Sequence, residues 1–330
     1  MKKIITLIVI VAMLTLTLTS CFDQESSTLT LKAEPNHDKV AEYIASGSID
    51  VAILPEPKAT VAINTAKTNG FNYSIKLNLS EEWDAISDTE LTMGCIVVNN
   101  EIKENYGKSL ADFMIDYKQS IEFIGNPDNK TEAAQMITNA SVLPKLPIAN
   151  SALSNLYGSI VYQDGAEMKN NLEGFYDAIE LQKPDDNFYL MPSGEAIGEC
   201  ENKIKIAVLN GPTGMGMAKL MNDSEKQDKY EFKLYSDPSL AATDLLNGEV
   251  DLACLPTNNA ALLYNKSKSI SVVSINCLGS LYVLAKDEIS ISSIQDLKDK
   301  TIYYGVPAST TAPIFEYIIS NNGLELGSDE

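Results

Sequence analysis

The sequence predicts an α/β protein made of two similar lobes that face one cleft. One nine-residue phrase occurs twice: residues 47–55 read GSIDVAILP and residues 248–256 read GEVDLACLP. Strand-like segments alternate with helical segments along most of the 330 residues, which is typical of parallel α/β lobes. Each copy of the phrase ends in Pro and is followed by polar residues. Such residues lie at the carboxyl end of a buried strand, where open α/β sheets bind ligands.

The first 20 residues are expected to be a signal peptide. A basic start is followed by an apolar run at residues 4–18. This run is shorter than the ~20 residues that a membrane span needs, and it is typical of a secretory signal. The following L-T-S-C sequence resembles a bacterial lipobox, which implies lipid on Cys21 and anchoring outside the cytoplasmic membrane. A plain signal peptide with an incidental Cys is the alternative.

Residues 21–27 are expected to form a polar tether, and the first half of the folded part follows it. Apolar residues keep helical spacing from 106 to 124, and a second amphipathic stretch covers 168–179. Pro, Gly and charged residues at 183–203 indicate a linker. The remaining elements expected here are strands at 28–33, 49–54, 72–79 and 93–98 and a helix at 37–46.

The second half begins with a buried strand at 204–209, read from IKIAVL, and a Gly-containing loop at 210–217. A Pro-containing loop covers 307–311. Further strands are expected at 231–235, 270–275, 281–286 and 301–306, and helices at 239–247, 293–298 and 312–322. The two halves therefore have the same alternation of strands and helices, as two α/β lobes require.

The order of the pieces is unusual. Residues 203–214 (KIKIAVLNGPTG) and 300–310 (KTIYYGVPAST) share a strand, a Pro-containing loop and a helix start. The first of these precedes GEVDLACLP by about one βαβ unit, as such units require. The second should precede GSIDVAILP, yet it lies at the other end of the chain. This order indicates that the chain was opened at a new position and that its original ends were joined. The alternative is a fusion of two incomplete fragments, each able to fold only with a second chain.

Taken from 204 to 330 and then from 28 to 190, the chain resembles solute-binding proteins of ABC importers, in particular the group that binds nitrate, taurine or thiamine precursors. The matching motifs are KIAVLNGPTGMGMAKL, GEVDLACLPTNNAALLYNK, SLYVLAKDEISISSIQDLKDKTIYY, GSIDVAILPEPKATVA, MGCIVVNNEI and DDNFYL. The order implies a circular permutation with its break between helix 312–322 and strand 28–33. Glu330 is then expected within roughly 15 Å of Ser27, the reach of a few extended residues.

The resemblance implies the type II periplasmic-binding-protein fold, with a hinge between the lobes. Lobe I would be residues 95–299, continuous through the linker, and lobe II would combine 27–94 with 300–330. The chain would cross between the lobes near 92–95 and 286–300. The implied partners are a small-molecule ligand and the permease and ATPase subunits of the importer.

The charged residues limit the chemical class of ligand that the chain can bind. The net charge of −20 argues against nucleic acid, because affinity for phosphates comes largely from Lys and Arg. The chain contains no arginine, so a bidentate guanidinium clamp on a carboxylate or sulfonate is absent. We therefore expect a neutral or weakly cationic heterocycle, such as a thiamine-precursor pyrimidine, rather than an amino acid or a sulfonate.

The candidate ligand-binding residues follow strand ends or flank the hinge strand. They are Glu56, Pro212, Thr213, Gly214, Met215, Thr257, Asn258, Asn276, Tyr282, Ala308, Ser309 and Thr310. The loop 210–217 lacks the G-K-[ST] of a nucleotide loop, and Lys219 stands where a dinucleotide fingerprint has its third Gly. Two interpretations of this loop remain: a turn that offers backbone N–H groups to a ligand at a helix N-terminus, or an ordinary βα turn.

Each polar candidate has a second interpretation. The hydroxyl and amide groups of Thr257 and Asn258, and of Ser309 and Thr310, suit either ligand contact or helix capping. The carboxylate of Glu56 either accepts from an amino or amidine group or is solvated. In the first interpretation, the residues of one lobe face those of the other across a gap.

Neither a catalytic set nor a metal motif emerges, and no cofactor is expected. His37 is the one histidine, so any Ser/His/Asp or His metal site would depend on it alone. Cys254 and Cys277 lie in apolar runs and are expected to be buried, with a disulfide left open. The alternative functions are an enzyme or a signalling receptor on the same fold. The missing His, Arg and metal clusters disfavour the first, and the missing kinase or transmembrane segment disfavours the second.

Overall fold

The computed structural model describes residues 28–191, 197–306 and 309–327. The expected signal peptide, the lipidated Cys21, the tether and Ala308 lie outside the described residues. So do Ser27 and Glu330, whose separation therefore stays a prediction.

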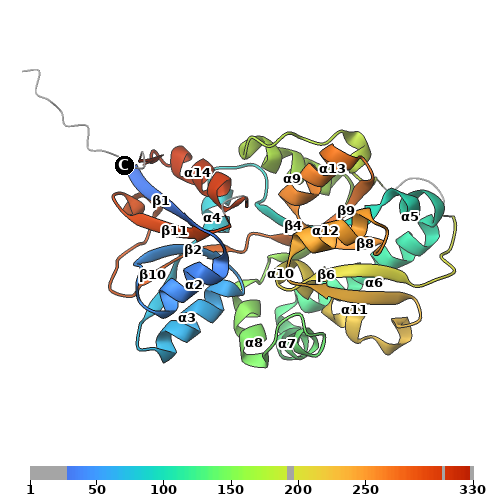
Figure 1. Cartoon of the computed structure of the whole chain (residues 1–330), viewed down its shortest axis with the longest axis horizontal. Helices are drawn as coiled ribbons and strands as arrows, with labels where there is room; N and C mark the ends of the chain where they lie inside the picture. The colour runs from blue at the N-terminus through green and yellow to red at the C-terminus, as the bar shows by residue number, and fades with distance from the viewer. Residues whose placement is uncertain (1–27, 192–196, 307–308, 328–330) are drawn as a thin grey trace, which may run out of the picture.

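The strands form two six-stranded sheets, one in each of two lobes that lie side by side (Figure 1). We call the lobe with β2 lobe II and the lobe with β8 lobe I. The lobe II sheet has the order β12-β1-β11-β2-β10-β3 and the lobe I sheet the order β5-β9-β4-β8-β6-β7. The lobe II strands are β1 (Thr28–Glu34), β2 (Val51–Pro55), β3 (Tyr73–Asn78), β10 (Leu281–Lys286), β11 (Thr301–Gly305) and β12 (Glu325–Leu326). The lobe I strands are β4 (Thr92–Asn99), β5 (Ile160–Gln163), β6 (Ile204–Leu209), β7 (Tyr230–Tyr235), β8 (Leu252–Pro256) and β9 (Ile270–Leu278).

Helices cover both sheets. Those of lobe II are α2 (His37–Ala45), α3 (Lys58–Thr68), α4 (Leu79–Asp84), α14 (Thr311–Asn321) and the short η4 (Ile294–Leu297). Those of lobe I are α5 (Asn100–Asn105), α6 (Gly107–Ile124), α7 (Lys130–Asn139), α8 (Leu146–Asn155), α9 (Gly165–Ala178), α10 (Pro212–Met215), α11 (Ala218–Asn222), α12 (Pro238–Leu246) and α13 (Thr257–Ser267), with the short η1 (Pro127–Asn129), η2 (Asp186–Phe188) and η3 (Ser224–Lys226).

The two copies of the repeated phrase occupy equivalent places. They form β2 and β8, whose apolar residues before the final Pro are all buried. Gly47 and Gly248 have φ values of 68° and 74°, a conformation that glycine adopts at little cost, and each lies in the turn that leads into its strand. β2 pairs with β11 and β10, and β8 pairs with β6 and β4. The five strands β1-β11-β2-β10-β3 thus correspond to β7-β6-β8-β4-β9.

Both sheets are mixed, which corrects the expectation of purely parallel lobes. In lobe II, β10 runs antiparallel to both neighbours, and in lobe I β4 does the same. β5 is also antiparallel to β9. β10 and β4 are the strands that arrive directly from the other lobe. A strand that enters without a crossover helix is free to run against its neighbours, whereas parallel neighbours require such a connection.

The predicted sheet partners of the strand expected at 28–33 are confirmed. β1 pairs in parallel with β11, and β11 pairs in parallel with β2, although β11 lies near the other end of the chain. The sheet of β6 contains none of these strands. Residues 28–55 therefore complete a sheet with residues 301–305 of the same chain, which contradicts the alternative in which each fragment requires a second chain. The backbone N–H of Gly327 donates to the Leu29 carbonyl at 2.8 Å, so the two described ends lie side by side.

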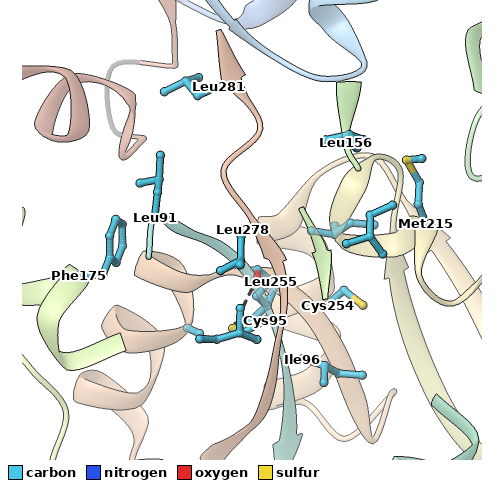
Figure 2. Packing of buried hydrophobic residues seen from close by; sticks show 14 of the residues in the cluster. Leu91, Cys95, Ile96, Leu156, Phe175, Met215, Cys254, Leu255, Leu278 and Leu281 are labelled. Atoms are coloured by element: carbon cyan, nitrogen blue, oxygen red, sulfur yellow. Dashed lines mark hydrogen bonds between the residues drawn. The ribbon is translucent and has the colours of Figure 1, made fainter. Parts of the chain in front are cut away.

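The chain crosses between the lobes twice, and the crossings touch. One is residues 85–91 and the other is residues 279–280, and the Gly279 N–H donates to the Leu91 carbonyl at 2.8 Å. Leu91, Leu278 and Leu281 belong to one buried cluster that continues into both lobes (Figure 2). The second crossing precedes β10, so residues 281–286, expected in lobe I, pair with lobe II strands instead. Residues 92–94, expected in lobe II, pair with lobe I strands, and η4, expected in lobe I, hydrogen-bonds to lobe II through Gln295 and Asn322. The rest of the predicted division stays a prediction.

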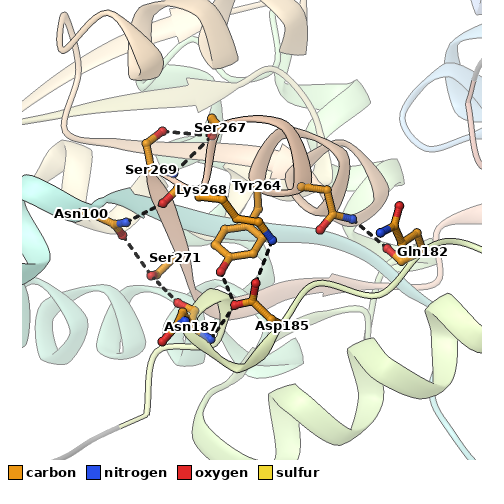
Figure 3. A network of polar contacts seen from close by, with 10 residues as sticks. Asn100, Gln182, Asp185, Asn187, Tyr264, Ser267, Lys268, Ser269 and Ser271 are labelled. Atoms are coloured by element: carbon orange, nitrogen blue, oxygen red, sulfur yellow. Dashed lines mark hydrogen bonds and ion pairs between the residues drawn. The ribbon is translucent and has the colours of Figure 1, made fainter.

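The first part of the expected linker is bound to lobe I. The Asp185 carboxylate accepts hydrogen bonds from Tyr264 and, at 2.8 Å, from Lys268 (Figure 3). Ser271 donates to the Asn187 carbonyl at 3.1 Å. These contacts tie the segment to α13 and β9. The composition of this segment is typical of a linker, but its side chains form hydrogen bonds with lobe I.

Candidate functional site

The lobes meet where the chain leaves β2 in lobe II and β6 in lobe I. The Glu56 carboxylate accepts a hydrogen bond from the side-chain amide of Asn155, the last residue of α8 in the other lobe. Tyr282 donates to the backbone carbonyl of the same asparagine. A Cβ placed on Gly211 would lie 3.8 Å from the Pro57 ring. We call these five residues the interlobe seam.

Glu56 is 2% exposed and its partners are neutral. Thr60 donates to it from its hydroxyl at 2.8 Å and from its backbone N–H at 3.2 Å. Within the described residues Glu56 forms no ion pair. Burial raises the pKa of its carboxyl, and the hydrogen bonds from Asn155 and Thr60 oppose this rise. Glu56 is thus a buried acceptor without a cation, which contradicts its interpretation as a solvated glutamate.

Predicted residues of lobe I gather at the start of β4. Asn276 donates to the Tyr117 hydroxyl at 2.9 Å. A Cβ on Gly94 would lie 2.5 Å from the Thr213 hydroxyl oxygen and 2.8 Å from the Asn276 side-chain oxygen, so Thr213 and Asn276 converge on one point. The Asn276 oxygen and the Thr92 hydroxyl are buried and have no hydrogen-bond partner within the described residues. Such oxygens are rare in proteins, and a ligand or water is the usual partner.

Thr257 and Glu56 hold equivalent positions, because each directly follows the Pro that ends its copy of the repeat. The Thr257 hydroxyl does not cap α13. It donates to the Thr92 carbonyl at 2.9 Å, within its own lobe. Thr257 therefore has a structural bond, whereas Glu56 reaches across to the other lobe. The two lobes therefore differ in chemistry at the first position after the repeat.

The other predicted residues are placed as follows. Pro212, Thr213, Gly214 and Met215 form α10, and Gly214 is packed so closely that an added Cβ would lie 1.9 Å from the Leu209 carbonyl. Asn258 is buried in the first turn of α13. In lobe II, the Ser309 hydroxyl lies 3.1 Å from that of Thr311, and Thr310 is the residue before α14 with no side-chain cap. Whether these residues contact a solute stays a prediction.

Sequence reasoning missed Asn155 and Thr60, two of the residues that surround Glu56. Thr60 lies four residues after Glu56, in the first turn of α3. In the sequence it looks like any other helical residue, and nothing indicates its contact with Glu56. Asn155 ends α8, a helix that was not expected. The Pro in the first turn of α8 is a helix-start signal that could have identified it.

Three buried cysteines and the histidine lie in environments typical of structural rather than reactive groups. Cys95, Cys254 and Cys277 are buried and free, so the disulfide left open between Cys254 and Cys277 is not formed. Burial, followed by the positive charge of Lys58, lowers the pKa of His37 to about 4. The described part of the chain holds no group of three or more His, Cys, Asp or Glu able to bind a metal. No helix among the described residues is long and apolar enough to cross a membrane.

No protein-family model matches the chain, and no curated protein matches it. Its structure is similar to those of ABC-transporter binding proteins. The binding protein of an ABC phosphonate transporter from Pseudomonas aeruginosa is 11% identical, with 80% of this chain and 59% of that chain covered and a TM-score of 0.36. A phosphate-binding protein from Streptococcus pneumoniae is 8% identical, with 82% and 76% covered and a TM-score of 0.35. An ancestral arginine-binding protein bound to arginine is 13% identical, with 87% and 72% covered and a TM-score of 0.31.

The chain thus spans 59% of the length of the phosphonate-binding protein. The fold is defined by the sheet topology described above.

Proposed function

We propose that this chain is the solute-binding component of an ABC importer, which captures a small molecule between its lobes and delivers it to a permease. The observation that carries the proposal is the meeting of two equivalent lobes at the carboxyl ends of β2 and β6. Open α/β sheets bind ligands at such strand ends. The two touching crossings are a short hinge about which the lobes can open and close.

The lipid anchor and the importer partners follow from the sequence. The L-T-S-C sequence supports lipid on Cys21, and the motifs quoted above support the nitrate, taurine or thiamine-precursor group. Replacement of Cys21 by Ala is expected to move the protein from the membrane fraction to the soluble fraction and to abolish incorporation of labelled palmitate. Unchanged membrane attachment of Cys21→Ala would contradict the anchor.

Solute binding is tested by a thermal-shift screen of amino acids, sulfonates, oxyanions, sugars and pyrimidines. A bound solute raises the melting temperature by mass action. Trp83 supplies a second signal, because it is the one tryptophan in the sequence and its ring lies 4.8 Å from Tyr317 of α14 and 5.7 Å from Phe175 of α9. Its emission should change as the lobes move. A screen in which neither signal responds would contradict the proposed function.

A further inference from the structure

We propose that the solute carries a protonated nitrogen, such as an ammonium or amidinium group, which Glu56 accepts, and that Asn155 occupies this place when no solute is bound. The inference rests on the proposed function of solute binding. It goes further because it names the chemistry that the seam selects and the internal group that a solute must displace.

The first argument is the shortage of positive charge around Glu56. A buried carboxylate is usually paired with a cation, since leaving water costs its charged form several kcal/mol. Here the described donors are one amide and the hydroxyl and N–H of Thr60. An N–H donor that carries charge would form a stronger bond to the carboxylate than a neutral amide does. A cationic solute therefore has a larger gain at this position than a neutral or anionic one.

The second argument comes from the repeat. Thr257 holds the position of Glu56 in lobe I and donates within its own lobe. In lobe II the backbone N–H of Glu56 already bonds to the Ser280 carbonyl at 2.9 Å, so the backbone at this position is held without the side chain. The carboxylate accepts from Thr60 in its own lobe, but unlike the Thr257 hydroxyl it also reaches across the seam to Asn155. A group that only one of two equivalent lobes carries, at their meeting point, is suited to recognition.

The third argument is the excess of acceptors in the neighbouring part of lobe I. The Asn276 side-chain oxygen has no donor within the described residues, and Thr213 converges on the same point. Thr213 is two residues from Gly211, where an added Cβ would lie 3.8 Å from Pro57, the neighbour of Glu56. A solute with several N–H groups could donate both to Glu56 and to the oxygens beside Asn276 and Thr213. An anion would meet a carboxylate and unpartnered oxygens instead, with no arginine in the chain to offset them.

Asn155 is the stand-in for the solute because, among the described residues, its side chain is the one that hydrogen-bonds to Glu56 from the other lobe. Its backbone carbonyl, at the end of α8, is held separately by Tyr282. The last carbonyls of a helix lack intrahelical partners, so this bond keeps the helix end in place whatever the Asn155 side chain does. Removal of the side chain alone should therefore free Glu56 while the helix end stays attached.

The test uses the full chain and three matched pairs of probes: benzamidine with benzamide, butylamine with butanol, and 4-(aminomethyl)pyrimidine with 4-(hydroxymethyl)pyrimidine. Binding is measured by titration calorimetry. We expect at least one cation to bind the wild-type chain about tenfold or more tightly than its neutral partner. In Glu56→Gln the preference should fall to within about twofold. Asn155→Ala should keep the preference and bind the cation several-fold more tightly.

Glu82→Gln is the matched control, because Glu82 is a partly buried glutamate whose pKa burial also raises, but it lies in α4, outside the seam. It should behave as the wild-type chain does. Melting temperatures and circular dichroism establish that each variant is folded. A purely structural Glu56 would lower stability in Glu56→Gln without changing the ratio between the two members of a pair.

The outcomes separate this inference from the proposed function. If phosphate, sulfate or a sugar binds and Glu56→Gln binds it equally well, the cation inference is overturned while solute binding stands. If a cation binds but keeps its preference in Glu56→Gln, the role of Glu56 is overturned. If no probe binds, and neither the solute screen nor Trp83 emission responds, both fail.

Discussion

Glu56 of lobe II accepts a hydrogen bond from the side chain of Asn155 of lobe I, although the two residues are 99 positions apart. The bond joins the first residue after β2 to the last residue of α8. It is the polar centre of the seam, in which Tyr282 also donates to the Asn155 carbonyl and Pro57 lies beside Gly211. The structure therefore represents the lobes in contact, and in our proposal a solute between them displaces Asn155.

Stability should depend on pH through Glu56. Burial raises the pKa of this carboxyl above its ordinary value of 4.5, so the folded chain holds the proton more tightly than the unfolded chain does. The contribution to stability is fully present below the ordinary value and is lost as pH rises through the folded pKa. We expect Glu56→Gln to gain stability relative to the wild-type chain over this window and then to stay level. Urea unfolding from pH 4 to 8 measures it, and parallel curves would contradict the prediction.

His37 should act in the opposite direction. Burial and Lys58 lower its pKa from 6.5 to about 4, so the unfolded chain binds a proton in this window that the folded chain does not. The folded state loses stability as pH falls from 6.5 to 4, by up to about 3 kcal/mol if the whole shift applies.

Because the chain has one histidine, NMR titration of its ring reports this pKa directly. His37→Gln should remove the corresponding slope from the stability curve. Lys58→Gln should raise the pKa of His37, since it removes a positive charge nearby. A titration midpoint near 6.5 in the wild-type chain would show that the ring is solvated.

The repeat was enough to predict β2, β8 and the sheet that β1 and β11 share. The buried apolar run between Gly and Pro is a local signal, and the rearranged order follows from comparing the two copies. The directions of β4 and β10 were not predictable in the same way. Both strands are buried almost throughout, so alternation is absent, and their direction depends on where the chain crosses between lobes.

The site was predictable only in part. Glu56 and Thr257 were identified because they follow strand ends, which is a local property. Asn155 was not, because its role depends on a contact between distant segments and no sequence motif marks such a contact. The same applies to Gly94, which is important only because Thr213 and Asn276 approach it.

Gly94→Ala should therefore destabilise the protein. Its Cβ would lie 2.5 Å from the Thr213 hydroxyl oxygen and 2.8 Å from the Asn276 oxygen, well inside contact distance. Overpacking of this kind costs about 1–3 kcal/mol. Thr213→Ala removes one of the two obstacles, so the double variant should recover part of the loss. Urea unfolding of the four chains forms a double-mutant cycle. Additive losses would mean that Thr213 does not limit the space beside Gly94.

The last prediction concerns the order of the chain. Gly327 bonds to Leu29, and β12 pairs with β1, so a short Gly/Ser link can join residue 327 to residue 28. A rearranged chain that runs from 197 to 327 and then from 28 to 191 interrupts no described helix or strand. It restores the sequential order of β11, β1 and β2 that β6, β7 and β8 already have in lobe I. We expect it to unfold cooperatively, within about 2 kcal/mol of the parent chain, with the same Trp83 emission and the same solute preference.

The matched control has the same link but is opened between Gly279 and Ser280, which cuts one of the two crossings. It should keep both sheets but lose the single transition, because only one connection then couples the lobes. A rearranged chain that fails to fold while the control folds would mean that the present order is required by the fold.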